Sequence, residues 1–272
     1  MTLKRCLQCP DYVLKRTWTR HLLCHVYPRK NNNAWQMDLE QLRSRIALFN
    51  GKRVIAIATD PGCDPPEAVQ EFMRACGPIE WIIVENDASL REVRTFNQLF
   101  ERIEAVAKDK DDHAIFYCHS KGATKPFNPG VTCHAWARTM YTVCLDYWPL
   151  VEETLDKYPL AGAFKKVGAG FVGSRSQWHY SGAYYWMRCR DLFAKNWREC
   201  DWCWYGIEPW PSLHYGADEA GCLFMDGKVP SLNLYSRRFW NAAVVPSFEA
   251  WKKDNKKYLS MDYANPRVQS AV

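Results

Sequence analysis

The chain has 272 residues, of which 47% are apolar and 24% charged, and this balance excludes wholesale disorder. Its length is enough for one large α/β domain with a substantial core. Lysine and arginine exceed aspartate and glutamate by 36 to 30, a mild excess that suits a phosphorylated small molecule, a membrane surface or nucleic acid without choosing among them.

Strand and helix patterns alternate through the first 160 residues. Apolar runs rich in β-branched residues predict strands at 22–28, 53–59, 79–84 and 113–118. Apolar stripes with the helical period predict helices at 38–49, 65–76, 89–106 and 133–157. This repetition predicts an α/β fold with a mostly parallel, Rossmann-like sheet and helices on both faces.

After residue 160 the regular alternation gives way to a region crowded with tryptophan and tyrosine. We interpret it as the aromatic-rich second half of the same domain, built over the edge of the sheet. The twelve cysteines lie mostly inside apolar runs, where a thiol behaves as a small hydrophobe. Because the sequence also lacks a signal peptide and a long uncharged apolar stretch, we expect a reduced, cytoplasmic setting.

Polar clusters follow three of the predicted strands. Asp60 follows the second, Asn86 and Asp87 follow the third, and the string His-Ser-Lys-Gly at 119–122 follows the fourth. In an open α/β sheet these carboxyl ends meet at one edge, where ligands bind. Lysine supplies a compact positive charge, glycine lets the backbone approach a ligand, and histidine can bind metal or donate a hydrogen bond. The pattern predicts a site for a phosphate-bearing substrate.

Two uses are open for the acidic residues at these strand ends. Asp60 and Asp87 could accept hydrogen bonds from a base or ribose, while Lys121 and His119 could hold a diphosphate. Helix capping is the competing interpretation, since aspartate is favoured just before a helix. For Asp87 the two interpretations have equal weight.

Short motifs extend from about residue 20 to 225. They lie at 25–28, 35 with 38–42, 49–53, 86–87 with 90–92, 117–122, 178–182, 205–211 and 219–224. In this order they resemble a group of bacterial and viral glycosyltransferase-like proteins, and the order of elements resembles a nucleotide-sugar glycosyltransferase of the GT-A type. The resemblance implies one domain over 1–246, with a nucleotide-binding half at about 20–130 and an acceptor half at about 131–246. A charged tail, expected to be loosely docked, follows at 247–272.

The resemblance also implies a nucleoside-diphosphate sugar as donor and a hydroxyl group as acceptor, on a glycan, a lipid-linked glycan or a modified nucleic acid. It assigns the donor to residues near the strand ends, namely His25, Tyr27, Asp60, Asn86, Asp87, His119, Ser120, Lys121 and Gly122. It assigns the sugar and acceptor to an aromatic segment that can stack on sugar rings, namely Trp178, His179, Tyr180, Ser181 and Gly182. A core strand is the competing interpretation for one face of this segment.

One departure from the GT-A pattern concerns the metal. Enzymes of this type commonly carry Asp-x-Asp after the fourth strand to hold a divalent cation against the diphosphate, whereas this chain has His-Ser-Lys at 119–121. Either Lys121 and His119 replace the metal and neutralise the departing diphosphate directly, or His119 and Asp87 hold Mg²⁺ or Mn²⁺. We favour a metal that is optional rather than obligatory.

Inverting glycosyl transfer needs a carboxylate that takes the proton of the acceptor hydroxyl. Asp218 and Glu219, just before an apolar run, are the preferred candidates for this catalytic base, and Glu208 competes with them. Helix capping is an equal alternative for Asp218. A retaining enzyme would need no such base.

Two other functions compete with glycosyl transfer. Cys6, Cys9, His21 and His25 approach the spacing of a Cys2His2 zinc finger, which with the flanking basic residues would suggest nucleic-acid binding. The central spacing is one residue short, however, and His25 belongs to a predicted strand. A non-catalytic relative that binds a nucleotide sugar or a glycan would carry the same pocket residues.

Overall fold

The computed structural model describes residues 17–30, 32–124, 132–168, 175–227 and 234–260. Seven strands in this part of the chain form one sheet in the order β3-β2-β1-β4-β8-β5-β9. Their bounds are β1 Thr19–Val26, β2 Arg53–Thr59, β3 Glu80–Glu85, β4 His113–His119, β5 Leu160–Ala163, β8 Tyr185–Arg188 and β9 Ala220–Phe224. Strand β8 runs antiparallel to β4 and β5, and every other pair is parallel. The predicted mostly parallel α/β sheet is confirmed.

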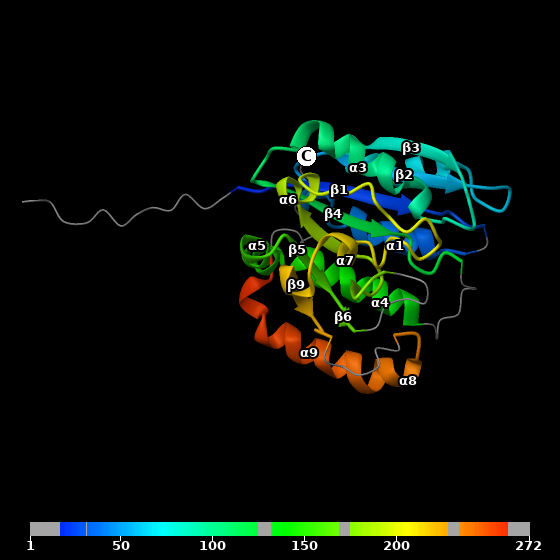
Figure 1. Cartoon of the computed structure of the whole chain (residues 1–272). Coiled ribbons are helices and arrows are strands. Elements are labelled where there is room, and N and C mark those ends of the chain that lie inside the picture. Colours follow the sequence, from blue (N-terminus) through cyan, green and yellow to red (C-terminus); the bar gives the residue numbers. More distant parts are fainter. Residues whose placement is uncertain (1–16, 31, 125–131, 169–174, 228–233, 261–272) are drawn as a thin grey trace, which may run out of the picture.

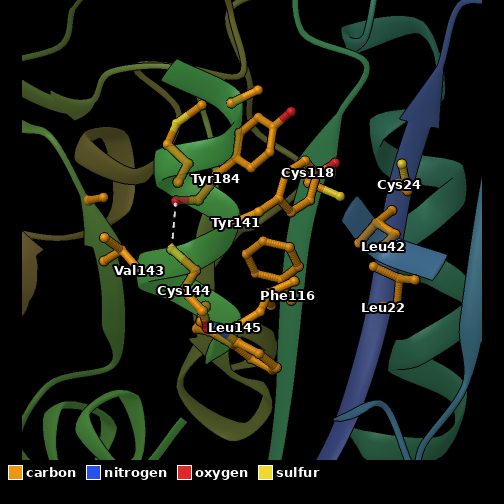
Figure 2. Close-up of a cluster of buried hydrophobic side chains, with 14 of the residues drawn as sticks. Leu22, Cys24, Leu42, Phe116, Cys118, Tyr141, Val143, Cys144, Leu145 and Tyr184 are labelled. Carbon is orange, nitrogen blue, oxygen red and sulfur yellow. Dashed lines mark hydrogen bonds between the residues drawn. The ribbon is translucent and has the colours of Figure 1, made fainter. Parts of the chain in front are cut away.

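Helices cover both faces of this sheet (Figure 1). One face carries α1 (Ala34–Arg43), α2 (Pro66–Phe72), α4 (Thr132–Tyr141) and α5 (Trp148–Lys157), and the other carries α3 (Val93–Ala107) and α6 (Cys189–Phe193). The alternation of side chains along β1 explains the two cores, since Leu22 and Cys24 face α1 and α4 whereas Leu23 faces α3. Figure 2 shows Phe116 and Cys118 of β4 beside Tyr141 and Tyr184 in the first core.

Shorter elements complete the described chain. A two-stranded sheet pairs β6 (Lys165–Val167) with β7 (Trp178–Tyr180). The remaining short helices are η1 Ile46–Leu48, η2 Arg74–Cys76, α7 Pro211–His214, η4 Ala217–Glu219, α8 Arg237–Phe239, η5 Trp240–Val244 and η6 Lys256–Tyr258. None of the helices in the described ranges has the length and apolar character needed to span a bilayer.

The helix predicted at 133–157 is interrupted. A π-helical segment, η3 (Thr142–Asp146), follows α4, and the backbone leaves the helical region at Tyr147 with φ −111° and ψ 44° before α5 begins. Pro149 gives the physical reason, because its ring would clash with the carbonyl of residue 145 and it has no N–H to donate.

The end of the described chain differs from the loosely docked tail that we expected from residue 247. Helix α9 (Val245–Asp254) lies with α8 on the opposite side of the sheet from α3 (Figure 1). Its Trp251 donates from Nε1 to the carbonyl of Leu223 at 2.7 Å, and its ring centroid lies 4.5 Å from that of Tyr147. The predicted boundary at 247 therefore falls inside a docked helix, and of the predicted tail residues 261–272 lie outside the described ranges.

Candidate functional site

The strand order reverses beside β1, because β2 and β3 extend the sheet on one side of it and β4 continues it on the other. Such a switch point leaves a crevice at the carboxyl ends of the two central strands. A pocket of ≈ 460 Å³ opens there, large enough for a nucleotide-sized ligand. His25 and Tyr27 line it from the end of β1, and residues 119–124 line it from the end of β4.

Ser120 joins these two strand ends. Its N–H donates to the carbonyl of His25 at 2.9 Å, which extends the parallel ladder by one bond. Its Oγ accepts the N–H of Tyr27 at 2.9 Å, beyond the last residue of β1. Ser120 therefore fixes the rim of the pocket through backbone contacts. Gly122, which follows with φ +84°, adopts a left-handed conformation that side chains disfavour.

Two histidines line the pocket, His25 buried and His119 with 13% of its side chain exposed. The Nε2 of His119 lies 3.0 Å from the carbonyl oxygen of Gly182, and because a carbonyl only accepts, this nitrogen carries the hydrogen. The Nδ1 of His25 lies 2.8 Å from Thr95 Oγ1, whose own hydrogen points to the carbonyl of Glu92 at 3.3 Å, so His25 donates from Nδ1. Burial lowers the pKa of both imidazoles to about 4, which makes them neutral at pH 7.

Lys121 supplies positive charge to the pocket. The residue lines the cavity and is only 8% exposed, and its Nζ lies 3.8 Å from the centroid of the Trp136 ring on α4. Within the described chain its ammonium forms no ion pair with a carboxylate. A cation held on an aromatic face keeps its donors available for an anion.

Asp60 acts on the pocket through its neighbours. It does not line the cavity, but its Oδ2 accepts hydrogen bonds from Tyr27 Oη at 2.5 Å and from Asn86 Nδ2 at 3.1 Å, and both of those residues do line it. The bond from Tyr27 is the main cause that lowers the pKa of Asp60, and burial raises the pKa of Tyr27 to about 12. Asp60 is therefore a positioning residue for the two predicted donor-binding side chains.

Asp87 does not line the pocket. Its Oδ1 accepts hydrogen bonds from the N–H of Ser89 at 2.8 Å and from Ser89 Oγ at 2.6 Å, a local turn before α3. Asp87 does not cap α3, whose N-cap is Glu92, and the structure does not bring Asp87 to His119. In the ranges that the structure describes, no three His, Cys, Asp or Glu side chains are grouped so that they could hold a metal ion. The predicted metal ligands do not fit, and we derive no step through a metal.

The predicted sugar-binding segment mostly belongs to the core. Trp178 is 1% exposed and donates from Nε1 to the carbonyl of Tyr215 at 2.9 Å, while Tyr180 donates from Oη to the carbonyl of Gly221 at 2.6 Å. His179 and Ser181 are also buried and do not line the pocket. The core interpretation therefore holds for this strand. These side chains are buried because β7 folds over the sheet on the side of α3.

Gly182 is the member of that segment that reaches the cavity. Its φ is +98°, and a Cβ added there would lie 2.8 Å from Met140 Sδ, so both backbone and space favour glycine. Its N–H donates to Glu208 Oε1, and its carbonyl accepts from His119. Gly182 thus connects the end of β4 to the carboxylate of Glu208, which lines the pocket.

The two preferred candidates for a catalytic base lie elsewhere. Asp218 and Glu219 form η4 immediately before β9, and Glu219 Oε2 accepts the N–H of Gly216 at 2.8 Å. Because β9 runs in the same direction as β4, residues that precede it lie at the amino edge of the sheet, opposite the pocket. Of the three carboxylates proposed from the sequence, Glu208 is the one in the cavity.

Sequence reasoning gave no role to several residues that line the pocket, including Arg91, Glu92, Trp204, Tyr205 and Tyr235. Burial raises the pKa of Glu92, and its Oε1 lies 3.7 Å from His119 Nδ1. Arg91 has a φ of +50°, an uncommon left-handed conformation for a residue with a side chain. The motifs at 90–92 and 205–211 contain three of the five, but nothing in their spacing indicated a pocket.

The described part of the proposed zinc site does not form. His21 and His25 both belong to β1, four residues apart, which places them about 13 Å from each other along an extended strand. His21 Nε2 instead lies 3.0 Å from His113 Nδ1. Zinc binds imidazole nitrogen at about 2.0–2.1 Å, so one ion cannot reach both residues. Cys6 and Cys9 lie outside the described residues.

Comparisons with known proteins cover protein families, curated proteins and solved structures. No protein-family model matches the chain, and no curated protein matches it. A solved structure of 4-diphosphocytidyl-2C-methyl-D-erythritol synthase aligns with 85% of this chain and 99% of its own, with 12% sequence identity and a TM-score of 0.38. A likeness of this size carries no argument about function, so the functional conclusion depends on the pocket itself.

Three histidines with lowered pKa values should make the fold unstable in acid. The pKa values of His21, His25 and His119 are lowered from 6.5 to about 4, chiefly by burial. In the unfolded chain these histidines take up protons near pH 6.5, whereas in the folded chain they stay neutral down to about pH 4. The free energy of unfolding is therefore at its full value above pH 6.5 and falls as the pH is lowered from 6.5 towards 4. Each shift corresponds to ~3 kcal/mol at its full extent.

We therefore expect the midpoint of thermal unfolding to fall steeply between pH 6.5 and 4, as followed by circular dichroism. These three histidines should together take up close to three protons when the chain unfolds at pH 5. Calorimetry in buffers of different ionisation enthalpy measures this uptake. An unfolding midpoint that stays constant from pH 7 to 5 would contradict the assignment of neutral, buried imidazoles.

Proposed function

We propose that the protein is a glycosyltransferase that moves a sugar from a nucleoside-diphosphate sugar to a hydroxyl acceptor on a glycan, a lipid-linked glycan or a modified nucleic acid. The observation that carries this proposal is the position of Lys121. An ammonium without a carboxylate partner among the described residues lines a nucleotide-sized cavity at the switch point of a mostly parallel sheet. That is where such sheets bind nucleotides, and an ammonium is suited to a phosphate.

The donor would lie across the ends of β1 and β4. Tyr27 and Asn86, held by Asp60, would contact the nucleoside on the side of β2 and β3. Lys121 would neutralise the diphosphate as the glycosidic bond breaks, since charge develops on that leaving group in the transition state. His119 would stay neutral there, with its Nε2–H committed to Gly182.

Glu208 would take the proton of the acceptor hydroxyl. It lines the pocket, and one of its oxygens accepts the N–H of Gly182, which orients the carboxylate towards the cavity end of β4. A carboxylate has a second oxygen free to accept when the first is engaged. This role applies to an inverting reaction, in which a base must activate the attacking hydroxyl.

A thermal-shift panel of nucleoside-diphosphate sugars, with and without Mn²⁺, tests the proposal. We expect a selective rise of the unfolding midpoint with one nucleoside, and a rise of similar size without Mn²⁺, because Lys121 supplies charge in place of the metal. A ligand present at a hundred times its Kd stabilises by about 2.7 kcal/mol, which the method detects easily. No shift with any donor, in either condition, would contradict the proposed function.

A further inference from the structure

The pocket contains a second cation without an ion-pair partner among the described residues, and it lies at a different depth from the first. Lys121 is nearly buried, whereas Arg91 is exposed at the rim. The guanidinium Cζ of Arg91 lies 4.8 Å from the ring centroid of Trp204. Each cation is therefore held on a tryptophan face rather than by a carboxylate, and each can accept an anionic partner.

The backbone holds Arg91 in this place. The N–H of Arg91 donates to the carbonyl of Asp87 at 2.7 Å, and the N–H of Leu90 donates to the same carbonyl at 3.1 Å. This tight turn places Arg91 at φ +50°, which a residue with a side chain adopts only when its surroundings impose it. Conformations of this kind cluster at ligand-binding sites, so the turn is consistent with a binding role for Arg91.

Trp204, which carries that guanidinium over its ring, also has apolar surface open to a ligand. It is 51% exposed and lines the mouth of the pocket. Glu208, the proposed base, lies four residues further along the same segment and lines the same cavity. A sugar ring that stacks on Trp204 would therefore share the cavity with the carboxylate that must activate its hydroxyl group.

Together these side chains match a particular kind of sugar. An indole face stacks on the apolar face of a pyranose ring, and a guanidinium forms paired hydrogen bonds with a carboxylate or a phosphate. We propose that Arg91 and Trp204 form the acceptor subsite and that the acceptor sugar carries an anionic substituent. The inference rests on the proposed function, because the diphosphate of the donor occupies Lys121 and leaves Arg91 for a second anionic group.

The test is ligand-observed NMR titration with three probes: methyl β-D-glucuronide, glucose 6-phosphate and the neutral methyl β-D-glucoside. We expect at least one anionic sugar to bind about tenfold more tightly than the neutral one, the size of effect that one charge-assisted pair provides. Tighter binding of the glucuronide would identify the substituent as a carboxylate, and tighter binding of glucose 6-phosphate would identify it as a phosphate. Arg91→Ala should abolish the preference, Arg91→Lys should keep part of it, and Trp204→Ala should weaken all three probes alike.

Matched controls lie close by. Arg94 is exposed on α3 and Trp202 is 60% exposed on the segment of Trp204, and neither lines the pocket. Arg94→Ala and Trp202→Ala should leave all affinities unchanged. The proposal is overturned if the neutral sugar binds as tightly as both anionic ones, if no probe binds, or if Arg91→Ala retains the preference.

Failure of the proposed function has a different signature. Nucleoside diphosphates titrated separately should bind the wild-type protein and Arg91→Ala equally well. If they bind neither, donor binding fails, while a sugar preference that depends on Arg91 still stands. If Trp204→Ala weakens a nucleoside diphosphate tenfold and leaves the sugars unchanged, Trp204 stacks on the base and the acceptor subsite is wrong.

Discussion

Replacing Lys121 by alanine should lower kcat/KM for transfer by about 10²–10³, the cost of removing one group that stabilises developing charge. Binding of the nucleoside-diphosphate donor should weaken as well, because the same ammonium contacts the diphosphate in the ground state. The midpoint of thermal unfolding should change little. The contact with Trp136 is worth about 0.5–2 kcal/mol, and removing a nearly buried charge offsets part of that loss.

Lys165 provides a matched control. It is as buried as Lys121, at 7% exposure, but its Nζ donates to the carbonyls of Ala217 and Ala220, away from the pocket. Lys165→Ala should lower the unfolding midpoint by several degrees and leave donor affinity intact, because two carbonyls, one of them buried, lose their donor. If Lys121→Ala instead destabilises the fold and keeps donor affinity, Lys121 has a structural role and the proposed function loses its main support.

Replacing Glu208 by glutamine should lower kcat by about 10²–10⁴ with little change in KM. The amide oxygen of glutamine can still accept the N–H of Gly182, so the local structure should persist while the ability to take a proton is lost. Single-turnover assays with saturating donor and acceptor measure this step directly.

The carboxylates of η4 are the controls for Glu208. Asp218→Asn and Glu219→Gln should transfer sugar at the wild-type rate, because both residues lie at the opposite edge of the sheet. Full activity in Glu208→Gln would exclude it as the base, and a large loss in either η4 variant would restore the original candidates. Donor binding without turnover in the wild-type protein would favour the non-catalytic relative.

The sequence was sufficient to predict four strands of the mostly parallel sheet and the edge on which the pocket lies. Strand β2 has the predicted bounds, 53–59, because an apolar run rich in β-branched residues is buried on both faces of the sheet. The polar string directly after β4 had to lie at the carboxyl edge of the sheet, and Ser120 and Lys121 line the pocket there beside His25 of β1.

The acceptor side could not be predicted in the same way. Asp218 and Glu219 looked like the start of a helix, but the apolar run after them is strand β9, and residues before a parallel strand lie at its amino edge. The order of aromatic and polar residues along 178–182 did not reveal that β7 folds over the sheet and buries Trp178. Arg91 and Trp204 are 113 positions apart in sequence, and their contact depends on packing alone.

Photoaffinity labelling with an azido nucleoside-diphosphate sugar tests the central claim most directly. The donor chosen by the thermal-shift panel should label peptides that contain Tyr27, Asn86 or Lys121, and unmodified donor in excess should suppress the labelling. Saturable labelling at the opposite edge of the sheet, around η4, or the absence of any saturable labelling, would contradict a donor site at the ends of β1 and β4.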